Sequence, residues 1–433
     1  MSSQDQRISI GRILLVQLVV LFAFVGAYAA MSTDSHDKLR RTLTQEKTFS
    51  VVKIDRQRPL EIQPIDVDSD IVSAADLAAV LRKVRPRFKV LIEKTGEYRL
   101  RSSLSPNHVE HALRTWRVEA EFDDPAVMTG SELVDFLTNH GKYLTSWNRE
   151  TRPLLIERPA GVAIRWGRTA GGSVHHDHWL ACLTEAGIPL DHAVFTPTRR
   201  DMTINDVVQE ALRDLRLDER ETEWSSMSFG LWLSPTKTWK SYDGRQMSFD
   251  LLATRLLRGD KRFGVCSGTH RVYSLMSLIR LDDDFDILSD PIRDSVYSHL
   301  ERVRDLIVAS QFQDGHWPSN WSQGAEAVKN PIDDPEHKQV IATGHHLEWL
   351  AIAPKDLYPP PEQIKKAADW IVAKTKSKSD SQILGHYTFY SHVGNALALW
   401  RSTRPPDFWN EWRKTHVVDG VSEPDLPADK ADH

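Results

Sequence analysis

Histidines recur near the starts of short, weakly charged segments along the chain. The segments read SPNHVEHALRTW, GSVHHDHWLACL, SGTHRVYSLMSLI, TGHHLEWLAIA and SHVGNALALW. Each contains Ser, Thr, Gly or Asn at its start, as helix N-termini prefer, and continues with small or aliphatic residues. Imidazole serves as an acid, a base or a metal ligand near neutral pH. Five such helices that bring their histidines together would therefore form a site for chemistry.

Three residue pairs within these segments have spacings that suit catalysis or metal binding. They are His175 with His178, Cys266 with His270, and His345 with Glu348. Residues three or four apart share a helix face. The first two pairs can therefore face a metal ion, and in the third the carboxylate can orient the imidazole. No C-x-x-C or H-E-x-x-H spacing occurs, so the sequence assigns neither a metal nor a cofactor.

The helices that would hold these residues alternate with a second, more charged set. That set reads AADLAAVLRKV, GSELVDFLTNHGKYLTSW, INDVVQEALRDLRL, IRDSVYSHLERVRDLIVASQ and PEQIKKAADWIVAKTK. Apolar residues three and four apart, with charges between them, are typical of amphipathic helices with one exposed face. Alternating buried and half-exposed helices predict two helical layers. We expect an all-α fold, an α/α toroid of about five helical hairpins, with an open α-solenoid as the alternative.

A short motif at the end of one amphipathic helix resembles a known family. Residues 311–317 read QFQDGHW, which resembles the Q-x-x-D-G-x-W element of terpenoid cyclases and protein prenyltransferases. The resemblance implies an α/α toroid in which Gln311 and Trp317 tie an outer helix to the following loop. The D-x-D-D motif of class II cyclases is absent, and neither cysteine stands in the D-x-C zinc pattern of prenyltransferases. The resemblance therefore implies a fold and assigns no activity.

In a toroid the inner helices would begin at one end of a central cavity, where free backbone N–H groups favour anions. We expect His178, His270 and His345 to begin inner helices and to border one solvent-reachable pocket. The predicted catalytic residues are His270, His345, Glu348 and Tyr390, with Tyr387 as a further candidate for mutation. The predicted cavity-lining residues are His178, Asp177, Cys266 and His392. Residues 219–264, which hold three tryptophans, are predicted to form a long loop over the cavity mouth.

The N-terminus carries a membrane-directing signal. Arg7 and Arg12 precede an uncharged run from Ile13 to Ala30, which as a helix nearly spans a bilayer. The run ends in the small-x-small pattern Ala27-Tyr28-Ala29, so a cleaved signal peptide competes with the favoured uncleaved anchor. Both place the body outside the cytoplasm, in the periplasm or at the cell exterior. The predicted organisation is a signal segment 1–31, a linker 32–70, a toroid 71–415 and a tail 416–433.

Composition limits the partners. The net charge is −5, from 55 basic and 60 acidic residues, whereas nucleic-acid binding needs a concentrated basic surface. The expected partners are the membrane, through the N-terminal helix, and a small-molecule or glycan ligand. Two cysteines cannot form a disulfide framework.

Three functions remain open from the sequence. The first is an extracytoplasmic enzyme that acts on a polysaccharide or another cell-envelope compound through a His-lined central cavity. The second is a cyclase-like enzyme that handles isoprenoids, which needs an apolar, aromatic cavity. The third is a non-catalytic binding or scaffold protein, which a cavity plugged by side chains would favour. The polarity and accessibility of the cavity distinguish the three, because one fold hosts many functions.

Overall fold

The computed structural model describes residues 16–22, 52–219, 221–259 and 265–416. The chain divides into two compact units, residues 1–51 and 52–433. Of the predicted signal segment only residues 16–22 are described, and they are helical and exposed. Within the described ranges, no helix has the length and apolar character needed to cross a bilayer. The rest of the run Ile13–Ala30, and residues 417–433 of the predicted tail, lie outside the described residues.

The second unit is built mainly from helices, which confirms the predicted all-α class. The helices buried along most of their length are α4 (Pro106–Trp116), α7 (His178–Glu185), α9 (Glu223–Leu233), α11 (Thr269–Phe285), α14 (Glu336–Ala351) and α17 (Tyr387–Leu399). The longer helices with an exposed face are α3 (Ala74–Lys83), α5 (Gly130–Thr138), α8 (Ile204–Asp214), α10 (Phe249–Leu257), α12 (Asp290–Ser310), α15 (Pro361–Lys376) and α18 (Pro405–Thr415). Short helices complete the unit: α6 (His140–Tyr143), α13 (Ala325–Lys329), α16 (Asp380–Gly385), η1 (Ser69–Ile71), η2 (Val265–Gly268), η3 (Trp321–Gln323) and η4 (Lys355–Leu357).

The strands of the described residues form short antiparallel hairpins on the periphery. The hairpins pair β1 (Lys89–Ile92) with β2 (Glu97–Leu100), β3 (Leu155–Arg158) with β4 (Gly161–Ile164), β5 (Ala193–Val194) with β6 (Met202–Thr203), and β7 (Thr238–Lys240) with β8 (Gln246–Ser248). In the first hairpin Val90 lies opposite Arg99, and in the second Ile156 lies opposite Ala163. Each sheet has two strands, so the helices carry the core.

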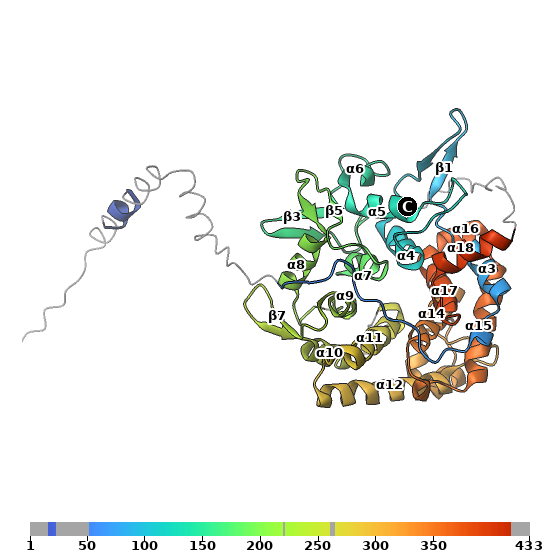
Figure 1. Cartoon of the computed structure of the whole chain (residues 1–433). Helices are drawn as coiled ribbons and strands as arrows, with labels where there is room; N and C mark the ends of the chain where they lie inside the picture. The colour runs from blue at the N-terminus through green and yellow to red at the C-terminus, as the bar shows by residue number, and fades with distance from the viewer. Residues whose placement is uncertain (1–15, 23–51, 220, 260–264, 417–433) are drawn as a thin grey trace, which may run out of the picture. The chain divides into compact units, whose positions relative to one another are not determined.

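The six buried helices pack against one another in chain order. Helix α7 contacts α4 and α9, α11 contacts α9 and α14, and α17 contacts α14 and α4. The half-exposed helices cover them from outside: α12 packs on α11 and α10, and α15 packs on α14 and α3. Figure 1 shows α12 and α15 at the edge of the unit, with α14 and α17 further in. Amphipathic helices therefore shield a set of helices whose side chains are buried on nearly every side.

Two parts of the predicted organisation differ from the structure. Residues 52–70, predicted as linker, belong to the second unit, where the Leu60 N–H donates to the Leu231 carbonyl over 2.9 Å. Residues 219–264 were predicted as a loop over the cavity mouth, which is wrong, because they contain α9, the β7–β8 hairpin and α10. The three tryptophans of this segment, Trp224, Trp232 and Trp239, are at most 3% exposed and pack in the core.

Gln311 and Trp317 join three parts of the fold. The Gln311 side-chain amide donates to the carbonyls of Gly315 and Gln363, each over 2.8 Å. The Trp317 indole N–H donates to the Ile307 carbonyl over 2.9 Å, and the ring is fully buried. These bonds connect the end of α12 to the loop after it and to α15, so both side chains have structural roles.

Replacement of Gly315 by alanine is expected to lower the free energy of unfolding by about 2 kcal/mol or more. Gly315 has φ of +108°, and an added Cβ would lie 2.4 Å from the Lys366 carbonyl oxygen. Urea unfolding followed by circular dichroism measures the loss. Gly385→Ala is the control, because an added Cβ there meets no described atom within 4 Å. Equal stability of the two variants would contradict this account of the loop.

Candidate functional site

Five of the buried helices each contribute two polar side chains, three positions apart, to one connected group. The pairs are His111 and Arg114 on α4, Cys182 and Glu185 on α7, His270 and Tyr273 on α11, His345 and Glu348 on α14, and His392 and Asn395 on α17. We call these residues the central cluster. Residues three apart share a helix face, so each helix presents its pair to one side while its other faces pack in the apolar core.

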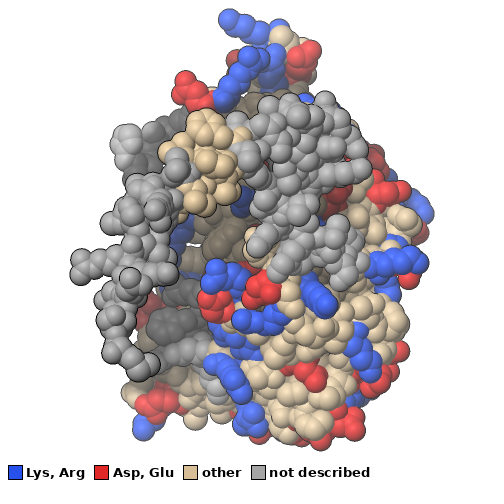
Figure 2. Space-filling model, turned by 90° about the vertical axis from the view of Figure 1, so that its left-hand side faces the viewer, with Lys and Arg blue, Asp and Glu red and all other residues tan. Residues whose placement is uncertain are grey.

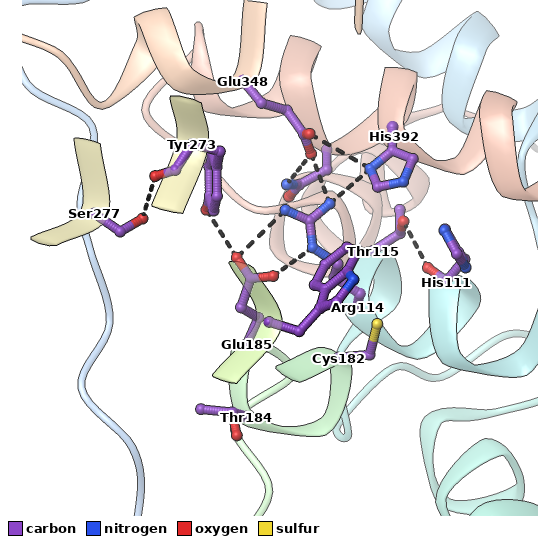
Figure 3. Close-up of polar contacts among 12 residues, drawn as sticks. His111, Arg114, Thr115, Cys182, Thr184, Glu185, Tyr273, Ser277, Glu348 and His392 are labelled. Carbon is purple, nitrogen blue, oxygen red and sulfur yellow. Dashed lines mark hydrogen bonds and ion pairs between the residues drawn. The ribbon is translucent and has the colours of Figure 1, made fainter. Parts of the chain in front are cut away.

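Arg114 lies in the middle of the central cluster and joins three helices (Figure 3). Its Nε donates to Glu185 Oε2. Its Nη1 donates to Glu348 Oε1 over 2.9 Å and to His392 Nδ1 over 2.7 Å. The Arg114 side chain is only 2% exposed. Because a buried guanidinium loses its hydration, these acceptors must compensate its charge.

Two further donors complete the bonding of the carboxylates. The Tyr273 hydroxyl donates to Glu185 Oε1 over 2.8 Å, and the Asn395 amide donates to Glu348 Oε1 over 2.9 Å. Burial alone would raise the pKa of Glu348, but Arg114 and the adjacent imidazoles hold it well below the usual range. The central cluster therefore pairs one guanidinium with two carboxylates, which leaves a net negative charge inside the molecule.

Three imidazoles of the central cluster contact one another. The ring centroid of His345 lies 4.1 Å from that of His270 and 4.0 Å from that of His392. The Nε2 atoms of all three rings are buried, and no described residue forms a hydrogen bond with them. Burial lowers the pKa of His345, and it lowers the pKa values of His270 and His392 well below the usual range. At neutral pH the three rings are uncharged.

The hydrogen bonds assign different tautomers to two of these rings. Ionised Glu348 accepts from His345 Nδ1 over 2.6 Å, so His345 carries its proton on Nδ1 and has a lone pair on Nε2. Arginine can only donate, so His392 Nδ1 accepts from Arg114 and the His392 proton lies on Nε2. The two rings therefore offer a proton acceptor and a proton donor side by side.

A second acid–imidazole pair adjoins the central cluster. His178 Nδ1 contacts Glu110 Oε2, which also accepts from the Ser173 hydroxyl over 3.0 Å. The His178 ring lies 4.7 Å from that of His111. Burial raises the pKa of Glu110 to about 8 and lowers that of His178 well below its usual range. This pair is therefore neutral at pH 7 and adds no charge to the interior.

Cys266 approaches the imidazoles from an unusual turn. Cys266 and Ser267 have φ values of +47° and +62°, and Gly268 follows at +82°, so three successive residues are left-handed before α11. The Thr269 hydroxyl donates to the Cys266 carbonyl over 2.7 Å, and the Trp321 indole donates to the Ser267 carbonyl over 3.0 Å. Non-glycine residues in this region are strained, and these bonds hold the turn. Cys266 is partly exposed, so it lies on the side of the three imidazoles that is nearest to solvent.

The structure brings together most of the predicted site residues. His270, His345, Glu348 and His392 belong to the central cluster, and His178 and Cys266 adjoin it. His178 is the first residue of α7 and His270 the second of α11, as predicted. His345 was predicted to begin a helix, which is wrong: α14 begins at Glu336, after Pro335 fixes the N-cap conformation.

Three of the candidate residues lie apart from the central cluster: the predicted catalytic Tyr390, the mutation candidate Tyr387 and the predicted cavity residue Asp177. The Tyr387 hydroxyl donates to the Val84 carbonyl over 2.9 Å. Burial and the adjacent Glu336 raise the pKa of Tyr390 to about 12. Asp177 accepts from the Ser225 hydroxyl over 2.5 Å and lines a different cavity of about 220 Å³, beside Trp166 and His176.

The predicted solvent-reachable pocket differs from the structure in its accessibility. His178 and His345 are fully buried, and His270 is 2% exposed. On the face shown in Figure 2, described acidic and basic residues are interspersed rather than gathered by sign. The described chemistry-bearing groups therefore converge in the interior, with Cys266 at its outer side.

Arg114, Glu185, Tyr273 and Asn395 were missed by the sequence reasoning. A signal for three of them was present: the buried segments read HALR, HRVY and HVGN, each with a polar residue three positions after a histidine. The pair His345 and Glu348, in HHLE, follows the same pattern and was found. A histidine followed by a polar residue at that spacing, in an otherwise apolar helix, indicates the helix face that meets the polar cluster rather than the apolar core.

Comparison with known proteins gives no relative. No protein-family model, curated protein or solved structure matches this chain. The function is therefore argued from the site.

Proposed function

We propose that residues 71–415 form an α/α toroid. The order of contacts supports this: each of the six buried helices contacts the next along the chain, and α17 contacts α4, which would close the ring. The half-exposed helices α3, α5, α10, α12 and α15 each pack on a buried helix, as an outer layer would. An open solenoid would leave α4 and α17 without a shared contact.

We propose that the toroid is an enzyme whose reacting groups are in the central cluster. One observation carries this proposal: a charged, hydrogen-bonded group lies where a core is normally apolar, and three of its imidazole nitrogens have no hydrogen-bond partner among the described residues. Buried ion pairs contribute little to stability, because desolvation offsets their attraction. Strongly shifted pKa values that gather in one place are typical of catalytic sites.

The chemistry best suited to this geometry is acid–base catalysis. The lone pair on His345 Nε2 can accept a proton from water or a substrate hydroxyl, while Glu348 orients the ring and stabilises its charge. The Nε2–H of His392 can donate to a developing oxyanion or a leaving group. The substrate class that we propose is a polysaccharide or another cell-envelope compound, because sugar hydroxyls and acyl groups match these donors and acceptors.

The alternatives follow from two observations. Handling of isoprenoids needs an apolar centre, and the ionised groups of the central cluster oppose it. A non-catalytic binding or scaffold protein is favoured by the burial of these same residues, since side chains fill the centre. A test of substrate turnover distinguishes the two remaining proposals, an enzyme and a scaffold.

Glu348→Gln is expected to lower kcat/KM by about 10²–10⁴-fold, because the amide cannot stabilise the imidazolium of His345. The assay is a panel of chromogenic glycosides, glycan esters and cell-envelope polysaccharides, followed by kinetics on each compound that is turned over. Glu97→Gln, on the exposed β1–β2 hairpin, is the control and should match the original protein. Unchanged kcat/KM in folded Glu348→Gln would exclude Glu348 from the reaction and contradict the assigned site, whereas no turnover of any panel member would favour the scaffold.

We further propose that the body lies outside the cytoplasm, tethered or secreted through the run Ile13–Ala30. A C-terminal reporter that is active only in the cytoplasm is expected to be silent in cells. A bright reporter would contradict this placement.

A further inference from the structure

We propose that Cys266, His270 and His345 hold a divalent transition metal, with zinc as the ion that fits them best. The Cys266 sulfur and one ring nitrogen from each histidine lie within 4.8 Å of one another. Zinc with a thiolate and two imidazoles at about 2.0–2.3 Å would need these atoms roughly 3.3–3.6 Å apart. Small rotations of the Cys266 and His270 side chains towards His345 would therefore close the ligand set around an ion.

The hydrogen bonds around the ligands leave the correct atoms available. Glu348 occupies His345 Nδ1, so the His345 lone pair on Nε2 is the one that can bind an ion. Nε2 of His270 is also buried and forms no hydrogen bond with a described residue. A buried polar nitrogen without a partner costs free energy, typically about 1–3 kcal/mol. A metal ion would satisfy both nitrogens at once.

The bond from His345 to Glu348 has the form of a carboxylate–imidazole–metal relay. Metal-binding histidines usually donate their other ring N–H to a carboxylate or carbonyl, which fixes the tautomer and ring orientation. Here the carboxylate is itself held by Arg114 and Asn395 over 2.9 Å each. The ring of His345 is therefore locked in place before an ion arrives.

The charges of the interior also fit a divalent ion. Two carboxylates, Glu185 and Glu348, face one guanidinium, Arg114. On binding, the Cys266 thiol gives its proton to solvent and becomes a thiolate. Two carboxylates, a thiolate, a guanidinium and a divalent cation sum to zero, so the metal neutralises the group.

A second possible set, His345, Glu348 and His392, is a poorer site. Its atoms are also within 4.8 Å of one another. Arg114 donates to both Glu348 and His392, so a cation there would lie against the guanidinium and would have to displace its bonds. His392 also carries its proton on Nε2 in this arrangement. We therefore assign the metal to the set that contains Cys266.

Three protein ligands leave a fourth position, as in catalytic zinc sites. Cys266 is the partly exposed member, so the fourth position would face its side. The ion would occupy the His345 lone pair, so in the metal-loaded protein a water at the fourth position, rather than His345, would supply the base and nucleophile of the proposed function; this step rests on that proposal, whereas the metal site does not.

The test is metal content of the full-length protein purified without chelators and measured by plasma mass spectrometry. We expect about one zinc per chain in the original protein and less than one tenth of that in Cys266→Ser and His270→Gln. Cys182→Ser and His346→Gln are the matched controls, each a buried residue of the same type, and should keep the metal.

Cobalt exchange provides a readout that does not depend on activity or on a single variant. Cobalt-loaded protein should show a thiolate-to-cobalt charge-transfer band that Cys182→Ser keeps and folded Cys266→Ala loses. A cobalt band that persists without Cys266, or zinc and cobalt that fail to bind the original protein, would overturn the proposal. Metal bound as expected, but with no turnover, would support a structural ion and contradict only the proposed function.

Discussion

Arg114→Met is expected to lower the free energy of unfolding by about 3–5 kcal/mol. Methionine fills much of the space of the arginine but leaves Glu185 and Glu348 without the guanidinium that compensates their charges. Tyr273 and Asn395 donate one bond each and carry no charge, so they cannot replace it. Urea unfolding at pH 7.5, compared with the original protein, measures the loss.

The expected loss comes from uncompensated charge, and a combined variant tests that cause. Arg114→Met with Glu185→Gln and Glu348→Gln removes both carboxylates as well and should recover most of the lost stability. Arg99→Met, on the exposed strand β2, should change stability by less than about 0.5 kcal/mol. If the triple variant is no more stable than Arg114→Met, shape and packing rather than charge explain the loss.

The half-exposed helices could be predicted from the sequence because one face contacts the core and the other contacts solvent. Apolar and charged residues therefore alternate with the helical period. Helix α15 runs from Pro361 to Lys376, the same residues that the pattern PEQIKKAADWIVAKTK marks. In α12 and α8 the charges fall on the face that meets solvent and the aliphatic residues on the face that meets the core. A helix at an interface between two environments has this signature.

Helix α9 could not be predicted in the same way because all of its faces lie in the buried core. All of its residues, Glu223–Leu233, are buried, so its sequence EWSSMSFGLWL shows no period. Its serines satisfy their hydroxyls locally: Ser228 donates to the Trp224 carbonyl over 2.8 Å. A polar residue bonded back to its own helix reads as a loop residue in the sequence.

Only some residues of the central cluster could be predicted from the sequence. Histidine is conspicuous because it is rare and reactive, so His270, His345 and His392 were selected from the sequence. Arg114 resembles the many surface arginines of the chain, and only tertiary packing shows that its side chain is buried between α4, α7 and α14. The role of a charged residue follows from which residues surround it, and those lie up to 278 positions away.

Acidification is expected to destabilise the protein well above the pH at which carboxylates titrate. Burial lowers the pKa of His108 to about 4, and it lowers those of His111, His178 and His392 well below 6.5. In the unfolded chain these rings titrate near 6.5. A group with a depressed pKa in the folded state contributes stability above its unfolded pKa and loses it as the pH falls. At pH 5.5 each ring therefore costs about 1.4 kcal/mol.

Glu110 acts in the opposite direction over the same range. Its folded pKa of about 8 exceeds its ordinary value of 4.5, so its contribution is present below pH 4.5 and is lost as the pH rises towards 8. From pH 7 to 5.5 this gain of about 2 kcal/mol offsets the loss from about one and a half histidines. For these five groups, the loss of about 5 kcal/mol from four rings less about 2 kcal/mol from one carboxyl gives a net loss of about 3 kcal/mol between pH 7 and 5.5, a large share of the 5–15 kcal/mol typical of a domain.

The measurement is the free energy of unfolding in urea at pH 7.5, 6.5 and 5.5, with a chelator present so that metal release does not contribute. His111→Gln should lower the free energy of unfolding at pH 7.5. Because one titrating group is gone, it should also reduce the slope of that free energy against pH by about 1.4 kcal/mol per pH unit below pH 6.5. His416→Gln, at an exposed position at the end of α18, should leave the slope unchanged. A free energy that stays constant from pH 7.5 to 5.5 would mean that the interior histidines titrate in the folded protein as they do in the unfolded chain. Burial would then not depress their pKa values, which would contradict this account of the interior.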